Sequence, residues 1–392
     1  MGLLAVVLAA GAVARASAAP TQVLPAALRA DLTTYLHDYA NAEHISAVSL
    51  SVSLAPGKPN VDVAAGTTQF GGNVPVTPAM LFQVGSNTKA FTAVTLLQLE
   101  ADGKLRMDDR IGRWFPQYPA WRNITIRQLL NMTSGIPTYD VLPAMWKPYV
   151  ADPYRFYSTG DLIAYVYPKT QFAPGHGWMY SNTAYLLSEM IIEAVTKHDY
   201  AVELRKRFFD GGPRLADVYY HTGVYPAALQ ARMVAGYFDS RDPDNAVLAP
   251  FLGRDMRPLS LSWAQGAGGI IATPHALTQW VRALYESPML SRAQHIQLET
   301  LVSLKNGAPI AKTTLADPRG FGLGVAQLTA PQMPTLWFYE GMTLGYRMSY
   351  AYFPRSRCVI AVGLNSQPDE KQDHSGPLVA SIYRTLKSNS QC

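Results

Sequence analysis

Ser86 and Lys89 are the two residues of this chain whose types and spacing most clearly suit covalent chemistry. No other lysine in the sequence has a serine three positions before it. Side chains at positions i and i+3 share one face of a helix, so the hydroxyl and the amine can meet. A serine hydroxyl is a weak nucleophile until a base takes its proton, and a buried lysine of depressed pKa can be that base. The pair predicts a serine nucleophile that attacks a carbonyl carbon.

A Tyr-x-Asn spacing, from Tyr180 to Asn182, supplies the second candidate group. Tyr180 can pass a proton between Ser86 and a leaving group in concert with Lys89. Asn182 can donate a hydrogen bond to the amide carbonyl of a substrate. The alternative is that Tyr180 is an ordinary core tyrosine at the start of a helix. The same spacing begins at Tyr39, but that copy lies in a helix expected to be peripheral, and we interpret it as a match without function.

The elements around this pair are predicted from hydrophobic periodicity. Residues 86–101 predict a strongly apolar helix, whose N-terminus would place a positive field and free N–H groups beside Ser86. Residues 24–42 have helical periodicity as well. Residues 47–54 and 61–66 are β-rich and flank a Pro-Gly turn, which predicts a hairpin.

Strand-forming sequence returns only late in the chain, after a long stretch of helix, loop and Pro-rich turn. The later strands and the final helix are predicted at 321–327, 336–340, 347–352, 358–364 and 376–387. The simplest architecture is an α+β fold, in which an antiparallel sheet made from both ends of the chain is flanked by helices. We assign 20–105 and 255–392 to this sheet domain and 106–254 to a mainly helical inserted domain, with the active site between them.

The first nineteen residues differ in kind from the rest of the chain. Leu3 to Val13 is a short apolar run, and Ala16 to Ala19 supply the small residues that a signal peptidase accepts. This run is too short to span a bilayer, and no later run reaches that length. The alternative is a buried first helix. We expect a signal peptide at 1–19, no transmembrane anchor, and a periplasmic or secreted protein.

The composition excludes several other classes of function. The chain has 392 residues, 48% hydrophobic and 16% charged, which suffices for a large core. The net charge of +5 is mild and the basic residues are scattered, so no nucleic-acid partner is expected. Cys358 and Cys392, the only cysteines, permit a disulfide without requiring one. No two histidines show His-x-x-x-His spacing and no Gly-x-Ser-x-Gly elbow occurs, so we expect neither a metal site nor an α/β-hydrolase.

Several segments carry a family resemblance. Residues 82–93 resemble the active-serine segment of the class C β-lactamase and D-alanyl-D-alanine carboxypeptidase superfamily, the penicillin-recognising serine hydrolases. Further landmarks follow in the family's order at 96–109, 124–137, 174–182 and 267–273. The resemblance implies Ser86 as nucleophile, with Lys89 and Tyr180 as its base pair. It also implies a sheet domain and a helical domain with the active site between them. We expect no cofactor.

The third motif of this family is where the sequence departs from it. The family carries Lys or His, then a small residue, then Gly, on the strand beside the site. A literal His-Thr-Gly begins at His221 but comes too early, and the positional match is Tyr339-Glu340-Gly341, followed by Met342. Gly341 lets the strand backbone approach the substrate. The resemblance implies that the N–H groups of Met342 and of the nucleophile form the oxyanion hole.

This departure bears on the substrate. Tyr339 keeps a hydroxyl donor but lacks the positive charge of the Lys or His that it replaces. Glu340 places a carboxylate where the family often binds the substrate's own carboxylate, and like charges repel. We predict an exported serine hydrolase acting through an acyl-enzyme on a small-molecule or peptide amide or ester, an esterase or D-amino-acid peptidase rather than a β-lactamase. The alternative is a catalytically silent penicillin-binding-like sensor on the same fold. The sequence leaves the oligomeric state open.

Overall fold

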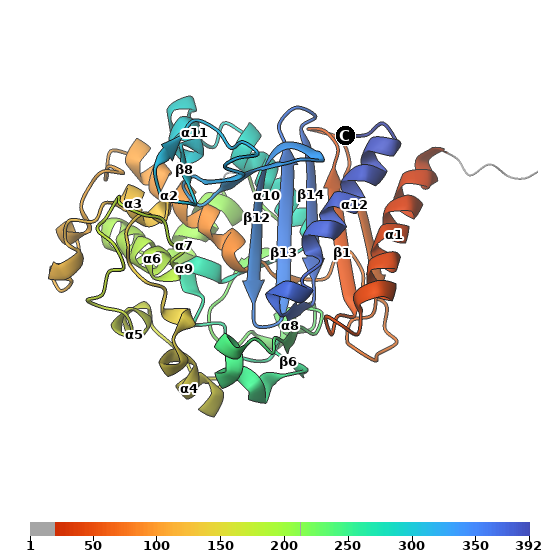
Figure 1. The fold of residues 1–392 in the computed structure, drawn as a ribbon, viewed down its shortest axis with the longest axis horizontal. Helices are drawn as coiled ribbons and strands as arrows, with labels where there is room; N and C mark the ends of the chain where they lie inside the picture. The colour runs from red at the N-terminus through yellow and green to blue at the C-terminus, as the bar shows by residue number, and fades with distance from the viewer. Residues whose placement is uncertain (1–19, 212) are drawn as a thin grey trace, which may run out of the picture.

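The computed structural model describes residues 20–211 and 213–392, so the predicted signal peptide lies outside the described residues. A nine-stranded sheet in the order β2-β1-β14-β13-β12-β11-β10-β8-β9 runs through the molecule, with every pairing antiparallel. Its strands are β1 (Ala47–Ser53), β2 (Val61–Gly66), β8 (Leu301–Ser303), β9 (Pro309–Ile310), β10 (Arg319–Phe321), β11 (Ala326–Ala330), β12 (Met333–Thr343), β13 (Tyr346–Phe353) and β14 (Cys358–Leu364). Strands from both ends of the chain lie side by side in this sheet (Figure 1). The predicted α+β fold is confirmed.

Helices cover both faces of the sheet, which explains why its central strand β14 is apolar and buried throughout. These helices are α1 (Pro20–Tyr39), α12 (Ser375–Ser388) and α10 (Pro274–Glu286). Successive strand residues point to opposite faces. Ile360 belongs to the same buried cluster as Leu28 of α1 and Ile382 of α12. Its neighbour Val359 belongs instead to the larger cluster that contains Trp280 of α10.

A helical region lies beside the sheet (Figure 1). The helices in it and beside it are α2 (Thr88–Ala101), α3 (Ile126–Leu130), α4 (Pro143–Ala151), α5 (Thr159–Ala164), α6 (Asn182–Thr196), α7 (Tyr200–Leu204), α8 (Ala227–Gln230), α9 (Gln265–Gly268) and α11 (Arg292–Glu299). Two small sheets have the orders β3-β7-β4 and β15-β5-β6. Their strands are β3 (Phe82–Gln83), β4 (Val218–Tyr220), β5 (Tyr237–Asp239), β6 (Arg254–Asp255), β7 (Ile270–Ala272) and β15 (Ser366–Pro368). The predicted domain boundaries stay a prediction.

One predicted strand is wrong in part. The segment 321–327 is two strands, because β10 ends at Phe321 and β11 begins at Ala326. The chain turns back between them, so Phe321 and Ala326 become antiparallel partners. Gly324 in this turn has φ +72°, a backbone conformation that favours glycine. A Cβ at Gly324 would lie 2.8 Å from the carbonyl oxygen of Lys89, so the turn passes closely beside α2.

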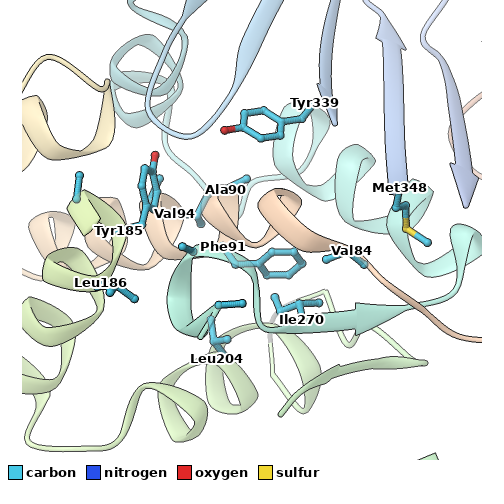
Figure 2. Packing of buried hydrophobic residues seen from close by; sticks show 14 of the residues in the cluster. Val84, Ala90, Phe91, Val94, Tyr185, Leu186, Leu204, Ile270, Tyr339 and Met348 are labelled. Atoms are coloured by element: carbon cyan, nitrogen blue, oxygen red, sulfur yellow. The ribbon is translucent and has the colours of Figure 1, made fainter. Parts of the chain in front are cut away.

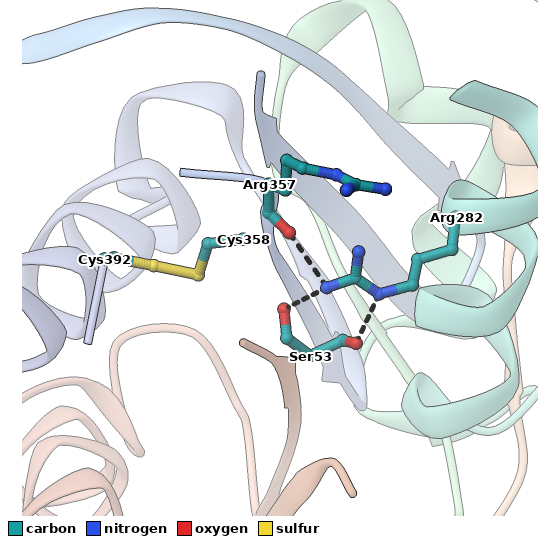
Figure 3. The surroundings of a disulfide bond; sticks show 5 residues. All are labelled: Ser53, Arg282, Arg357, Cys358 and Cys392. Atoms are coloured by element: carbon teal, nitrogen blue, oxygen red, sulfur yellow. Dashed lines mark hydrogen bonds between the residues drawn. A yellow bond between two sulfur atoms is a disulfide. The ribbon is translucent and has the colours of Figure 1, made fainter. Parts of the chain in front are cut away.

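A disulfide joins Cys358 at the start of β14 to Cys392, which follows α12 (Figure 3). The sequence left this pairing open. The bond fastens the end of α12 to the sheet that the helix covers. On the other side of the same strand end, Arg282 of α10 donates to the main-chain carbonyls of Ser53 and Arg357, each at 2.8 Å. Within the described part of the chain, no helix combines the length and apolar character needed to cross a membrane.

Candidate active site

Ser86 stands in a tight turn between β3 and α2. The turn is a single 3-10 turn from Gly85 to Asn87, so the α-helix predicted to begin at Ser86 starts two residues later. Gly85 has φ +51°, and a Cβ there would lie 2.6 Å from the main-chain nitrogen of Met342. The side-chain amide of Asn87 donates to the carbonyl of Val84 at 2.8 Å and to that of Met348 in β13 at 2.7 Å. The turn is thereby held against the sheet.

Lys89 is fully buried on the first turn of α2 and lies against Ser86. Its Nζ is 2.9 Å from Ser86 Oγ and donates to the main-chain carbonyl of Ala267 in α9 at 2.8 Å. Burial lowers the pKa of Lys89 to about 7, although the negative charge of Asp140 opposes the shift. Near neutral pH a large fraction of this amine is therefore unprotonated and able to accept a proton.

Tyr180 approaches Ser86 from the helical side. Its hydroxyl donates to Ser86 Oγ at 2.6 Å. The ring of Tyr180 also lies near the amine of Lys89, 4.8 Å from Nζ to the ring centroid. Ser181 caps helix α6 by accepting from the N–H of Ala184 at 3.2 Å, which fixes the chain immediately after Tyr180. Burial raises the pKa of Tyr180, so its hydroxyl stays protonated at neutral pH.

Asn182, the first residue of α6, is joined to a residue that the sequence did not single out. Its side-chain amide donates to Asp140 Oδ2 at 2.7 Å, and its main-chain N–H donates to the hydroxyl of Thr138 at 3.1 Å. Thr138 also donates to the other carboxylate oxygen of Asp140. The sequence signal for Asp140 was only its place three residues after the landmark that ends at Pro137. Nothing in its residue type alone distinguished it from a surface carboxylate.

Gly341 brings the edge of β12 against the Ser86 turn. Strand β11 pairs with β12 only as far as Phe338, so the last part of β12 continues alone on that edge within the described chain. A Cβ at Gly341 would lie 1.9 Å from the carbonyl oxygen of Val84 and 2.7 Å from the main-chain nitrogen of Ser86. Only glycine allows this approach. It brings the main chain at the end of β12 against the Ser86 turn, and the oxyanion hole implied for Met342 stays a prediction.

The structure corrects the prediction for Tyr339, which does not line the cavity, whereas Glu340 does line it. Tyr339 is buried and is absent from the cavity lining, and its hydroxyl points toward the side of α2 on which Tyr185 lies (Figure 2). Successive strand residues face opposite sides, so Glu340 points the other way. Its carboxylate accepts from the hydroxyl of Ser375 at 3.0 Å. Loss of hydration at that carboxylate and the negative charge of Asp373 raise the pKa of Glu340 to about 7, although the residue as a whole is exposed. Glu340 therefore lies at the cavity rim, turned toward α12.

A cavity of about 350 Å³ opens in front of Ser86. It is lined by Ser86, Tyr139, Asp140, Trp146, Tyr180, Asn182, Asn245, Leu248, Trp263, Ala264, Ala267, Gly268, Glu340, Met342, Thr343, Leu344 and Gln367. Of the predicted site residues, Lys89, Tyr339 and Gly341 thus lie behind the lining. His221, from the His-Thr-Gly that comes too early in the chain, is not part of the lining. Much of the wall is aromatic or aliphatic, as in pockets for small organic ligands.

A buried lysine and a neutral tyrosine converge on one serine hydroxyl, beside the edge of an antiparallel sheet flanked by helices, in a chain with the β-lactamase/transpeptidase fold. The chain belongs to the beta-lactamase family, whose model matches residues 33–383. This agrees with the resemblance drawn from the sequence motifs.

Two relatives show how far this similarity extends. Penicillin-binding protein 4* of Bacillus subtilis (strain 168) is 27% identical over 306 residues, which cover 77% of this chain and 64% of that protein. Protein flp of Staphylococcus aureus (strain MW2) is 31% identical over 163 residues, 40% of this chain and 31% of that protein. The matched parts thus span less than two thirds of either relative.

Solved structures are similar over nearly the whole chain. D-amino acid amidase from Ochrobactrum anthropi SV3, complexed with L-phenylalanine amide, gives a TM-score of 0.76 at 21% identity and covers 94% of this chain and 99% of its own. D-stereospecific amidohydrolase from Streptomyces sp. gives 0.73 at 23% identity, with 91% and 98% covered. At these identities the likeness establishes the fold.

Proposed function

We propose that this protein hydrolyses an amide or an ester through an acyl-enzyme formed on Ser86. One observation carries the proposal. Ser86 Oγ lies 2.9 Å from the Lys89 amine and 2.6 Å from the Tyr180 hydroxyl, and Ser86 opens onto a cavity that can hold a small organic substrate. A serine between an available base and a proton donor is the arrangement that nucleophilic catalysis requires.

The geometry supports a two-stage reaction. Lys89, with a pKa of about 7, takes the proton of Ser86 while the oxygen bonds to the substrate carbonyl carbon. The negative charge that develops on the carbonyl oxygen would be met by the N–H groups of Ser86 and Met342. Tyr180 donates a proton to the leaving amine or alcohol and regains one from Lys89. The amine or alcohol departs, and the acyl group stays bound to Ser86. Water then attacks the ester by the reverse route, and the acid is released.

Among hydrolases of this fold, we place the protein with esterases or D-amino-acid peptidases and amidases rather than with β-lactamases. Among the residues that the structure describes, the cavity lining contains no Lys, Arg or His that could bind the carboxylate of a penicillin or of a peptide C-terminus. Similarity in fold to a D-amino acid amidase and a D-stereospecific amidohydrolase supports the same choice.

A catalytically silent binding protein on the same fold is the second candidate. The observation that favours it is the altered third motif, in which the buried Tyr339 stands where the family has a cation. Reaction with a fluorophosphonate probe separates the two candidates, because only an activated serine is labelled rapidly.

The decisive experiment combines this probe with two serine variants. Wild-type protein should be labelled and should hydrolyse p-nitrophenyl acetate, and Ser86→Ala should lose both, with a fall in turnover of several orders of magnitude. Ser188→Ala is the control for the fold, since Ser188 is fully buried in α6 and, among the described residues, bonds only to the carbonyl of Ala184 in its own helix. Peptide mass spectrometry should find the adduct on Ser86. Labelling at another residue, or full activity in Ser86→Ala, would refute the proposal.

We also propose that the protein is exported. The apolar run from Leu3 to Val13, with the small residues after it, supports a cleaved signal peptide. The disulfide between Cys358 and Cys392 supports an oxidising compartment. N-terminal sequencing of protein recovered from the periplasm or the medium tests this, and the mature chain should begin near Pro20. Recovery of uncut protein from the cytoplasm alone would contradict it.

A further inference from the structure

We propose that Asp140 binds an ammonium group of the substrate, so that the preferred substrates are amides or esters that carry a free amine near the scissile carbonyl. The inference rests on the proposed hydrolysis at Ser86 and extends it to the charge of the substrate. It is carried by the charge distribution of the cavity and by the hydrogen bonds of Asp140.

The charged groups of the cavity are both acidic. Among the described residues that line it, Asp140 and Glu340 are the only ones with a charged side chain, and none is Lys, Arg or His. The nearest catalytic cation, Lys89, lies behind Ser86 and is only partly protonated at neutral pH. A cavity with this balance attracts cations and repels anions.

The two carboxylates are not equivalent. The carboxylate of Glu340 is directed to α12, where it accepts from the Ser375 hydroxyl. Asp140 instead lies on the side of Tyr180, because it accepts from Asn182, two residues further along the chain. Its charge also acts on Lys89 and raises the pKa of that amine. Asp140 is thus the acidic group on the reacting side of the cavity.

The hydrogen bonds of Asp140 use only part of what its carboxylate can accept. The Thr138 hydroxyl donates to Oδ1 and the Asn182 amide donates to Oδ2, and both donors are neutral. A carboxylate has about four acceptor positions, so two remain for a ligand. A side-chain amide oxygen would satisfy a neutral donor equally well. The negative charge is therefore in excess of what these two contacts require, and a cationic substrate group would offset it.

The walls around Asp140 suit an aromatic or aliphatic substituent beside such a cation. Trp146 donates through Nε1 to the main-chain carbonyl of Asp140 at 2.7 Å. Its ring meets that of Trp263 with centroids 5.1 Å apart. Tyr139 donates to the carbonyl of Trp263, so the loop that carries Asp140 also fixes this aromatic wall. Aromatic faces attract cations as well as apolar groups. The chemistry on this side thus fits an amino-acid amide or ester with a large side chain.

The test compares substrates that differ only in charge. Phenylalanine amide carries an ammonium group, 2-hydroxy-3-phenylpropanamide replaces it with a neutral hydroxyl of similar size, and both enantiomers of each are assayed. For the preferred enantiomer, we expect wild-type kcat/KM to favour the ammonium substrate. Asp140→Asn should lower this ratio by roughly 10- to 100-fold, because it removes the charge and keeps an acceptor for Asn182. Glu340→Gln is the matched control and should change the ratio by less than about threefold.

The pH dependence of the same ratio gives a second readout. Both substrates meet the same enzyme, so titration of Lys89 cancels in the ratio. The ammonium group loses its proton near the pKa of an ordinary α-amine, about 8, and the preference should fall as pH rises through that value. A merely structural role for Asp140 predicts no such fall.

The outcomes separate this inference from the proposed function. If neutral esters are hydrolysed in a Ser86-dependent manner but wild-type enzyme shows no preference for the ammonium substrate, or Asp140→Asn leaves the preference intact, the role of Asp140 is wrong and the hydrolase stands. If no substrate is turned over, calorimetry with Ser86→Ala still decides the matter. Binding of phenylalanine amide that is tighter than that of the hydroxy analogue, and weakened by Asp140→Asn in the same background, supports the role. Equal binding overturns it.

Discussion

The two sides of the cavity are built in different ways. On the side of α2 and α6, the chain presents side chains, and those of Lys89 and Tyr180 converge on a single oxygen of Ser86. On the side of β12, the chain presents its main chain, because Gly341 has no side chain and Tyr339 is buried behind the lining. The first side therefore depends on the functional groups of its side chains, and the second depends on the lack of a side chain at Gly341. A substitution should therefore act through chemistry on one side and through shape on the other.

The largest effects are expected where the side chains converge. Lys89→Ala and Tyr180→Phe should each lower kcat/KM by roughly 10²- to 10⁴-fold, because each removes a proton-transfer group. The double variant should lose little more than the worse single variant, since Ser86 has one proton to give up. Steady-state kinetics on p-nitrophenyl acetate measure all three.

Tyr185→Phe is the control for this cycle. Its ring lies near the Lys89 amine, 5.4 Å from Nζ to the ring centroid, but its hydroxyl donates to the carbonyl of Leu130 and not to Ser86. A loss of less than about tenfold is expected, because no reacting proton passes through it. Losses that simply multiply in the Lys89 and Tyr180 double variant would show that the two residues do not act as one unit.

The next effect tests the main-chain side. Gly341→Ala places a Cβ 1.9 Å from the Val84 carbonyl oxygen, so β12 has to move away from the Ser86 turn. A displacement of about 1 Å costs about 100-fold in rate, and overpacking costs roughly 1–3 kcal/mol of unfolding free energy. Kinetics and urea unfolding measure the two effects.

Gly376→Ala provides the comparison for that variant, because a Cβ there meets nothing within 4 Å. It should leave kcat/KM unchanged and shift the unfolding free energy by no more than about 1 kcal/mol, in the stabilising direction if at all. If Gly341→Ala changes kcat/KM and the unfolding free energy as little as Gly376→Ala does, the close approach of β12 to Ser86 is not needed for activity.

The pH dependence of kcat/KM tests a titratable group on each side of the cavity, Lys89 and Glu340. Lys89 acts as a base only when unprotonated, so kcat/KM for a neutral ester should rise with pH and reach half its maximum near pH 7. The charge of Asp140 raises the pKa of Lys89, so Asp140→Asn should move this rise to lower pH. Glu340 also has a pKa of about 7, and Glu340→Gln should leave the midpoint in place. If the midpoint moves in Glu340→Gln but not in Asp140→Asn, the group that titrates near pH 7 is Glu340 and not Lys89.

The sequence predicted the side-chain half of this site better than the strand half, for physical reasons. Helical spacing places Lys89 on the same face as Ser86 whatever surrounds them, and the order of the landmarks located Tyr180. A strand offers two faces, and the tripeptide at 339–341 does not show which one meets the cavity. Asp140 escaped notice because its role depends on Asn182, 42 residues away in the chain. Likewise, the prediction of one strand at 321–327 was wrong because the chain turns at Gly324, where it packs closely against α2.

The smallest effect is expected at the tyrosine that replaces the family's cation. The hydroxyl of Tyr339 is buried and lacks a well-formed hydrogen bond to any described residue. Burial raises the pKa of this phenol, so it carries no charge at neutral pH. Tyr339→Phe removes only that hydroxyl, and should change kcat/KM by less than about threefold and unfolding free energy by at most about 1 kcal/mol. The informative partner is Tyr339→His, which restores the family's residue type beside Tyr180 without altering the main chain of Gly341. If the cation matters only for anionic substrates, this variant should gain activity on carboxylate-bearing esters and not on neutral ones, as parallel assays of a monoester acid and its methyl ester would show. A large loss in Tyr339→Phe on neutral esters would instead mean that Tyr339 passes protons to Tyr180, and that the strand side contributes a side chain after all.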